Sequence, residues 1–190
     1  MSKILYHVSP VHGLTMLEPR KSSHGKNYVY AIDDLVTGLL FGVKKDDFDF
    51  LMDSQAGVTE IFECYPNAFE MKYRNQSCSV YEVDDNGFLS GQTGWSPEFV
   101  SKTPVAVKKE CYIEDLYVYL LEKIKENKLI VHHYADDLTY KAMISEHIID
   151  RVIRFELLDD QELLEHDTRF CTYYAALIKQ LKEAMSGKYL

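Results

Sequence analysis

The chain lacks the cysteine patterns of disulfide-rich and zinc-binding proteins. Its four cysteines include no C-x-x-C pair, and none lies at metal-ligand spacing from a histidine. Long apolar runs are missing too, because none reaches the roughly 18–20 residues that cross a bilayer. The start, Met1-Ser2-Lys3, leads into a strand-like segment and has no apolar signal-peptide core. We therefore expect a cytoplasmic protein with free thiols and no membrane partner.

An excess of positive charge is also missing. The formal net charge is −9, and the basic residues are scattered or interleaved with acids, as in Lys108-Lys109-Glu110. Binding to a phosphate backbone depends on clustered lysine and arginine. The composition therefore argues against a nucleic-acid partner.

Two candidate metal-binding patterns are incomplete. The acidic stretch at 46–50 lacks the glycine and the closing glutamate of a calcium loop, and it predicts a surface loop. His132 and His133 are adjacent, so in a strand their side chains point to opposite faces. We expect no metal, and the sequence leaves open whether residues 46–53 act as a lid.

The pattern of apolar residues changes near residue 114. Short runs typical of strands occur before it, at residues 3–9, 28–32, 60–65, 69–73, 79–83 and 105–113. After it, apolar residues recur at a spacing of three to four, which predicts helices up to about residue 186. We expect an α+β fold with a mostly antiparallel β-sheet core in residues 1–113. A C-terminal helical region, residues 114–190, would pack on this core as a single compact unit.

Two local signals refine this layout. Asp33 and Asp34 supply N-cap chemistry for a helix that directly follows the strand at 28–32. Asn86-Gly87 suits a type I′ turn and predicts a hairpin there.

Three strand-like segments, 4–10, 28–33 and 95–101, each place a functional side chain beside a turn signal. The first carries His7. The second carries Tyr28 and Tyr30, which alternate with an intervening valine and therefore share one face of the strand. The third carries Glu98, directly after a proline. A histidine, a tyrosine and a glutamate are the groups that a site for a flat heteroaromatic ring and a ribose needs.

In this order, the three segments resemble the ADP-ribosyltransferase superfamily, in its diphtheria-toxin and poly-ADP-ribose-polymerase branch. Tyr6-His7-Val8-Ser9 is similar to a strand that ends in Tyr-His-Gly-Ser, and residues 28–33 to a Tyr-Phe-Ala strand that leads into a helix. Glu98-Phe99-Val100-Ser101 looks like the third motif, a Glu-Tyr-Ile/Val-Val strand. The resemblance covers about residues 3–113. It implies the split, mostly antiparallel sheet of that superfamily, with NAD as the cofactor.

The resemblance also implies roles for single residues. His7 would bind a ribose hydroxyl of NAD, the backbone of Val8 would pair with the nicotinamide carboxamide, and Tyr30 or Tyr28 would stack on the ring. Glu98 would stabilise the positive charge that develops on the ribose as nicotinamide leaves. The residues implied in catalysis are Glu98, His7 and Tyr30, and those implied in NAD binding are His7, Val8, Ser9, Arg20, Tyr28 and Tyr30. Arg20 and the loop of His24, Gly25 and Lys26 are candidates to contact the pyrophosphate.

Two functions follow as alternatives. The first is an ADP-ribosyltransferase or an NAD glycohydrolase-like protein that cleaves the nicotinamide–ribose bond of NAD, with a protein or small-molecule acceptor that the sequence does not name. The second is a non-catalytic protein-interaction module on the same fold. The helical tail is a candidate for homo-oligomer contacts in either case. The enzyme hypothesis requires that His7, a tyrosine and Glu98 face one cleft.

Overall fold

The computed structural model describes residues 2–21, 26–43, 48–55, 58–160, 167 and 169–186. The chain is an α+β protein with mostly antiparallel sheets and a C-terminal helical region, which confirms the predicted class. It divides into two compact units. The first comprises Met1–Lys45, Ser54–Thr59 and Glu70–Ile130, and the second comprises Asp46–Asp53, Glu60–Phe69 and Val131–Leu190. The division into residues 1–113 and 114–190 stays a prediction.

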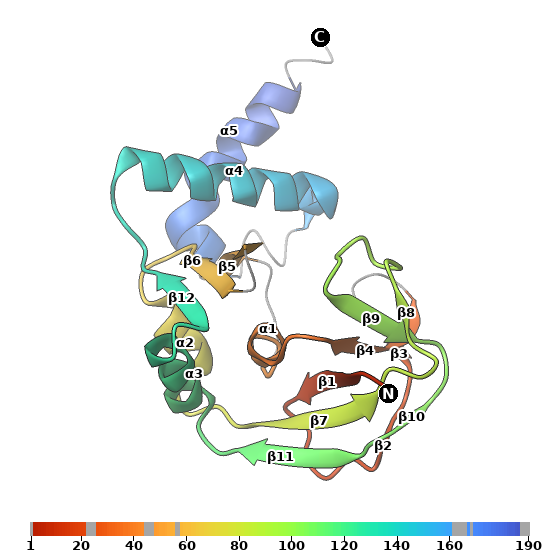
Figure 1. The fold of residues 1–190 in the computed structure, drawn as a ribbon. Coiled ribbons are helices and arrows are strands. Elements are labelled where there is room, and N and C mark those ends of the chain that lie inside the picture. The colour runs from red at the N-terminus through yellow and green to blue at the C-terminus, as the bar shows by residue number, and fades with distance from the viewer. Residues whose placement is uncertain are drawn as a thin grey trace. The chain divides into compact units, whose positions relative to one another are not determined.

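A seven-stranded sheet forms the centre of the first unit, in the order β11-β7-β1-β4-β9-β8 with β3 added beside β4 (Figure 1). All of these neighbours pair antiparallel. The strands are β1 Ile4–Ser9, β3 Arg20–Lys21, β4 Asn27–Ile32, β7 Cys78–Asp84, β8 Leu89–Ser90, β9 Glu98–Ser101 and β11 Lys109–Ile113.

Two smaller sheets and several helices complete the described elements. The sheets pair β10 Val105–Ala106 with β2 Met16–Leu17, and order β12 Leu129–His132, β6 Val58–Glu63 and β5 Phe50–Gln55 side by side. The helices are α1 Leu35–Leu39, α2 Ala68–Tyr73, α3 Leu116–Lys125, α4 Leu138–Arg154 and α5 Ala175–Ser186, with short turns η1 Leu157–Asp159 and η3 Phe170–Tyr174. Of the described helices, none is long and apolar enough to cross a membrane.

One core cluster of the first unit forms on one face of the seven-stranded sheet. Leu5, Val29 and Tyr81 are all buried there, because alternation along each strand directs their side chains to this face. The Tyr81 hydroxyl remains satisfied because it donates to the carbonyl of Val11 at 2.7 Å. Side chains on the other face of β4 and β7 are buried as well, so the centre of this sheet is covered on both faces.

The sheet opens between β1 and β4. These two strands share a single registered pair, Tyr6 with Ile32, whereas β1 and β7 share six. At the opening, a side chain replaces the missing ladder contact, because the Nδ1–H of His7 donates to the carbonyl of Tyr30 at 2.7 Å. β1 and β4 are therefore neighbours in the sheet, but they are hydrogen-bonded to each other along only part of their length.

Helix α1 lies against β1 and β4 beside this gap. Its N-cap is Asp34, whose carboxylate accepts from the backbone N–H and the hydroxyl of Thr37, both at 2.7 Å. One turn further, Gly38 packs so closely that an added Cβ would lie 2.8 Å from Ile32 Cγ2 and 3.3 Å from Val8 Cγ2. The predicted cap is confirmed, and a glycine is needed where the helix touches the sheet.

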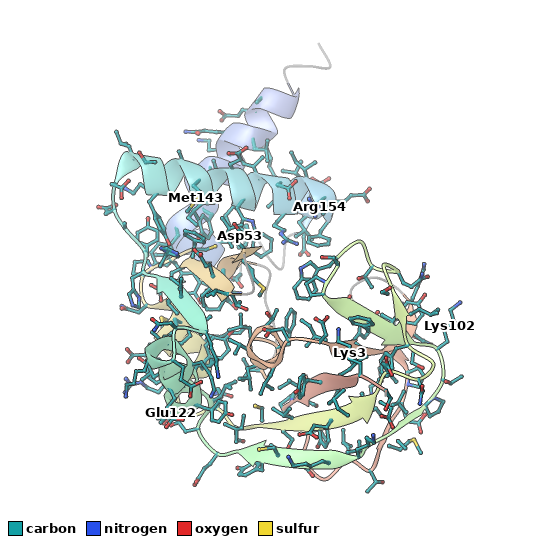
Figure 2. The ribbon with its side chains drawn as sticks, viewed as in Figure 1. Lys3, Asp53, Lys102, Glu122, Met143 and Arg154 are labelled. Atoms are coloured by element: carbon teal, nitrogen blue, oxygen red, sulfur yellow. The ribbon has the colours of Figure 1, made fainter. Side chains whose placement is uncertain are left out.

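The second unit has its own apolar core, built mainly from α4 and the C-terminal helices. Ile148 and Phe170 are fully buried in it, and Met143, labelled in Figure 2, packs against it from α4. Asp49 is also buried, and its carboxylate accepts from the Tyr65 hydroxyl at 2.8 Å and from the Arg169 guanidinium. An ion pair inside the core thereby joins the segment around residue 49 to the start of η3.

This burial corrects the prediction of a surface loop at 46–50. Phe48 and Asp49 are buried and Phe50 begins β5, while residues 46 and 47 lie outside the described residues. The acidic residues suggested exposure, but Arg169, distant in sequence, neutralises Asp49. A pairing over 120 residues leaves no local signal.

Four further expectations from the sequence are wrong. Residues 69–73 form most of helix α2 and not a strand, because the buried Glu63 carboxylate accepts from the Phe69 N–H at 2.8 Å at its first turn. Asn86-Gly87 closes no hairpin: only Gly87 of the two has a positive φ, and β8 pairs with β9 instead of β7. The segment 105–113 divides into β10 and β11, which pair with different strands. Strand β12 also interrupts the region after residue 114 that we expected to be wholly helical.

Candidate functional site

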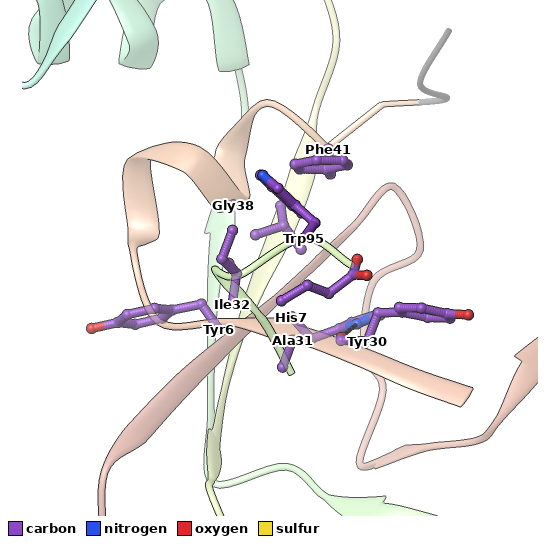
Figure 3. Close-up of a pocket in the computed structure, with 10 residues that line it drawn as sticks. Tyr6, His7, Tyr30, Ala31, Ile32, Gly38, Phe41 and Trp95 are labelled. Atoms are coloured by element: carbon purple, nitrogen blue, oxygen red, sulfur yellow. Dashed lines mark hydrogen bonds between the residues drawn. The ribbon is translucent and has the colours of Figure 1, made fainter. Parts of the chain in front are cut away.

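A pocket lies in the first unit beside the opening between β1 and β4 (Figure 3). Its volume is about 90 Å³, below the roughly 300–1,000 Å³ of sites that bury a drug-sized ligand. It can therefore enclose one ring of a larger molecule and leave the remainder outside. The lining residues are Tyr6, His7, Val8, Tyr30, Ala31, Ile32, Gly38, Phe41, Trp95 and Glu98.

Strand register brings the lining residues of the sheet together. Tyr6 pairs with Ile32 across β1 and β4, and Ile32 pairs with Glu98 across β4 and β9. Residues directly opposite in antiparallel strands point to the same face, so these three side chains form one row. Tyr30 is two residues along β4 on that same face and diagonal to Glu98, a placement that separates such neighbours by roughly 7–8 Å.

His7 reaches the pocket from the other side of β1. By alternation it belongs with Leu5 and not with Tyr6 and Val8, but its ring enters the gap where β1 and β4 separate. The carbonyl of Tyr30 can only accept, so Nδ1 carries the proton and, in the neutral ring, Nε2 is an acceptor. No hydrogen bond from Nε2 to any part of the chain that the structure describes is present.

The protonation state of His7 follows from its surroundings. Burial lowers its pKa below the ordinary value of 6.5, and the positive charge of Arg20 lowers it further. The bond to the Tyr30 carbonyl acts in the opposite direction but does not reverse the shift. At neutral pH the ring is therefore uncharged, and Nε2 keeps its lone pair.

Two aromatic side chains on turns form another wall of the pocket. Phe41 follows α1, where its N–H donates to the carbonyl of Gly38 at 3.0 Å, and Trp95 lies in the turn before β9. Their ring centroids are 5.5 Å apart with the planes tilted by 47°, and Figure 3 shows the two rings beside each other. The Glu98 N–H donates to the Trp95 carbonyl at 3.2 Å, so one turn positions both residues.

Four of the residues that the sequence singled out line this one pocket: His7, Val8, Tyr30 and Glu98. Three others do not. Tyr28 is buried and packs edge-on against Tyr30 with centroids 5.8 Å apart, which confirms that the two share a face. The Ser9 hydroxyl accepts from the Val11 N–H at 3.1 Å. Arg20 is exposed on β3 opposite Tyr28, and its charge is still felt at His7.

The rest of the predicted pyrophosphate loop is only partly visible. Lys26 is exposed just before β4, while His24 and Gly25 lie outside the described residues. The proposed contact of this loop with a pyrophosphate stays a prediction.

Sequence reasoning did not select Phe41 or Gly38, and it included Trp95 only as the first residue of the segment 95–101. Phe41 stands eleven positions after Tyr30 at the end of a short helix, and nothing local says which way a turn residue points. Trp95 follows Gly94, which has a φ of 81°, a conformation that sharpens the turn. A single tryptophan just before the candidate glutamate was the one available signal.

Among the described residues, no group of three or more histidine, cysteine, aspartate or glutamate side chains could hold a metal ion. Comparison with known proteins adds no assignment: no family model, curated protein or solved structure matches this chain.

Proposed function

We propose that this protein binds NAD and cleaves its nicotinamide–ribose bond, as an ADP-ribosyltransferase or an NAD glycohydrolase-like enzyme. The observation that carries the proposal is that His7, Tyr30 and Glu98, which come from three separate strands, line one pocket. The enzyme hypothesis required this arrangement. NAD is then the substrate, and the acceptor is water, a small molecule or a protein.

The sheet supports the proposal through its opening. A split, mostly antiparallel sheet is the finer fold class that the resemblance implies. The single registered pair between β1 and β4, against six between β1 and β7, is consistent with such a split. The pocket beside the opening is where a ligand could reach groups from both halves.

The proposed binding mode follows from the lining residues. Neutral His7 would accept a hydrogen bond at Nε2 from a ribose hydroxyl, a role that fits its fixed tautomer. The nicotinamide ring would lie among Tyr30, Phe41 and Trp95, whose faces favour a flat cationic ring. Because the pocket has only about 90 Å³, the adenosine end would stay outside it, and we expect modest affinity.

The proposed chemistry depends on Glu98. When the bond between ribose C1′ and the nicotinamide nitrogen breaks, its electron pair leaves with nicotinamide and positive charge develops on the ribose. A carboxylate bonded to the neighbouring hydroxyl stabilises that charge more than it stabilises the substrate. The acceptor then bonds to C1′ and releases its proton to solvent or to a carboxylate. Such an electrostatic contact is worth about 3–4 kcal/mol, or roughly a hundred- to a thousandfold in rate.

Trp95 provides the binding assay, since it is the only tryptophan in the chain and lines the pocket. Adding NAD should change its fluorescence saturably, and nicotinamide release should be detectable in the same samples. Glu98→Gln should lower release by about a hundred- to a thousandfold with little change in affinity. Glu18→Gln is the matched control, because Glu18 is exposed in the same unit and does not line the pocket.

Two substitutions at His7 separate its two nitrogens. His7→Asn can keep a donor near the Nδ1 position for the Tyr30 carbonyl while it removes the Nε2 acceptor. His7→Gln extends an amide oxygen toward the Nε2 position. We expect His7→Asn to fold normally and lose NAD binding, with partial binding retained in His7→Gln. If millimolar NAD does not change the Trp95 fluorescence of the unmodified protein, the enzyme proposal is wrong.

One observation favours a second candidate, the non-catalytic interaction module. Three aromatic rings, Tyr30, Phe41 and Trp95, together with Glu98 line a small pocket, and this combination suits an alkylated ammonium group. Under this alternative a trimethyl-lysine peptide, but not its unmethylated form, should alter Trp95 fluorescence. Phe41→Leu should weaken that response, and nicotinamide should not be released from NAD.

A further inference from the structure

The second unit contains a larger cavity than the candidate site. It has a volume of about 270 Å³ and is lined by residues of the loop before α4, of α4 itself, of η3 and of α5. Its aromatic lining includes Tyr134 and Tyr173, and its polar lining includes Ser145 and Thr172. This volume approaches the lower limit, roughly 300 Å³, of sites that bury small organic ligands.

The tyrosines that line this cavity are held firmly. The ring of Tyr134 packs edge-on against Tyr140 with centroids 5.8 Å apart, and its backbone N–H donates at 3.0 Å to the buried carboxylate of Glu63. Tyr173 stacks on Tyr65 with centroids 5.7 Å apart and planes only 16° from parallel. Tyr174, beside them, is buried and its hydroxyl donates to the carbonyl of Cys64. Rings fixed in this way can receive a flat ligand with little loss of side-chain entropy.

A π-helical turn positions two of these tyrosines, Tyr173 and Tyr174. Phe170–Tyr174 is a π-helical turn that runs into α5, and such turns occur frequently at functional sites. Within it Phe170 and Tyr174 are buried while Tyr173 is 45% exposed. The turn therefore supplies both a buried anchor and an accessible ring.

Hydroxyl groups at the cavity have unused hydrogen-bonding capacity. Tyr134, Ser145, Thr172 and Tyr173 each carry a hydroxyl, and none of these four hydroxyl groups makes a hydrogen bond to another described residue, so each is open to a ligand. A hydroxyl both donates and accepts, so four of them can match a ring that carries both kinds of group on its edge. Purely apolar ligands would leave this capacity unused.

The charge at the cavity favours a neutral ligand. Lys141 is the cation among the lining residues, and its ammonium group is 2.5 Å from the carboxylate of Asp136. An anion would have to compete with that carboxylate for Lys141, whereas an uncharged ring would not.

From these observations we propose that the second unit has a binding site for an uncharged planar heteroaromatic ring, of the kind found in a purine nucleoside. The ring stacks on Tyr134 or Tyr173, and its edge exchanges hydrogen bonds with Ser145 and Thr172. The site belongs to the second unit alone, and it stands whether or not the pocket at Trp95 binds NAD.

The test is equilibrium dialysis of the whole chain with adenosine, with ribose as the ligand control. We expect saturable binding of one adenosine per chain and none of ribose. Tyr173→Leu should lower the affinity about fivefold or more, as expected for the loss of one stacking partner. Tyr112→Leu is the matched control, because Tyr112 is a comparably exposed tyrosine of the first unit.

A second variant guards against misfolding of Tyr173→Leu. Ser145→Ala combined with Thr172→Val removes two hydroxyls that bond to no described residue, so it should fold and still lower adenosine affinity. Trp95 fluorescence should not respond to adenosine, which separates this site from the proposed NAD pocket. The proposal is overturned if adenosine shows no saturable binding at millimolar concentration. It is also overturned if the Ser145→Ala/Thr172→Val variant binds adenosine as tightly as the unmodified chain.

Discussion

Replacing Gly38 by alanine tests the packing that forms the floor of the candidate site. The new Cβ would lie 2.8 Å from Ile32 Cγ2 and 3.3 Å from Val8 Cγ2, whereas carbon atoms in good contact are about 3.5–4.0 Å apart. Both contacts are with methyl groups of branched side chains on strands, so either these side chains or the helix must shift. In an unhindered helix the same change would stabilise the protein by about 1 kcal/mol.

The expected magnitude is the difference between these two effects. Overpacking of a dense interior costs about 1–3 kcal/mol. Subtracting the gain in helix propensity leaves a net loss of about 1 kcal/mol, which lowers the melting temperature by roughly 2–4 °C for a chain of this size. The added methyl group would also occupy part of a pocket of only about 90 Å³, so any ligand of that pocket should bind more weakly.

Thermal and urea unfolding followed by Trp95 fluorescence are the assays, since this tryptophan lies in the same unit as Gly38. The control is the Ile32→Ala background, which removes the methyl group that the new Cβ would meet. There we expect Gly38→Ala to be neutral or stabilising by up to about 1 kcal/mol. The two substitutions should therefore be coupled by about 1–2 kcal/mol in a double-mutant cycle.

Two outcomes would refute this reasoning. If Gly38→Ala stabilises the unmodified protein, α1 does not press on β4 as described. If its effect is the same in both backgrounds, Ile32 is not the neighbour that limits the space.

Three further predictions concern charge and thiol chemistry. Burial holds the pKa of His7 in the folded protein below 6.5, its value in the unfolded chain. The stabilisation that neutral His7 gives is therefore complete above pH 6.5 and is lost as the pH falls from 6.5 toward the folded pKa. Urea titrations at several pH values should show this loss in the unmodified protein but not in His7→Gln. Arg169→Met should lower the free energy of unfolding by about 3–5 kcal/mol, measured by circular dichroism, because the buried Asp49 carboxylate loses its ion pair with Arg169. Adding Asp49→Asn should restore most of the lost stability. A thiol reagent should label exposed Cys111 rapidly in the native protein but not Cys78, which is buried with its pKa raised to about 12; equal labelling would contradict the described β7.

The sequence predicts the elements whose signal is local. Alternation identified β1 and β4, and Asp34 identified the start of α1, because each depends on neighbours within a few residues. The prediction of a strand at residues 69–73 is wrong, since five residues with mixed polarity fit either period. Their helix is fixed by Glu63, whose carboxylate caps it from the preceding strand. No recognisable sequence pattern marks a buried glutamate that caps a helix beginning several residues later.

The candidate site shows the same limit. His7, Tyr30 and Glu98 could be named in advance because each is the polar or aromatic member of a short strand. Tyr28 could not be separated from Tyr30, because they share a face, and only the packing shows that Tyr28 is buried and Tyr30 lines the pocket. Phe41 reaches the pocket from a turn whose direction depends on the contact between Gly38 and the sheet.

His7 links the fold of the first unit to the chemistry proposed for it. Its Nδ1–H bonds to the Tyr30 carbonyl at the point where β1 and β4 no longer pair, so the ring stabilises the opening beside the pocket. That bond leaves the proton on Nδ1, and burial keeps Nε2 unprotonated, which makes Nε2 an acceptor. A mixed phenotype in His7→Ala would therefore be ambiguous, because it combines a lost structural bond with a lost acceptor. Comparison of His7→Asn with His7→Gln separates the two, because His7→Asn should keep the stability and lose ligand affinity, whereas His7→Gln should lose stability and keep part of the affinity.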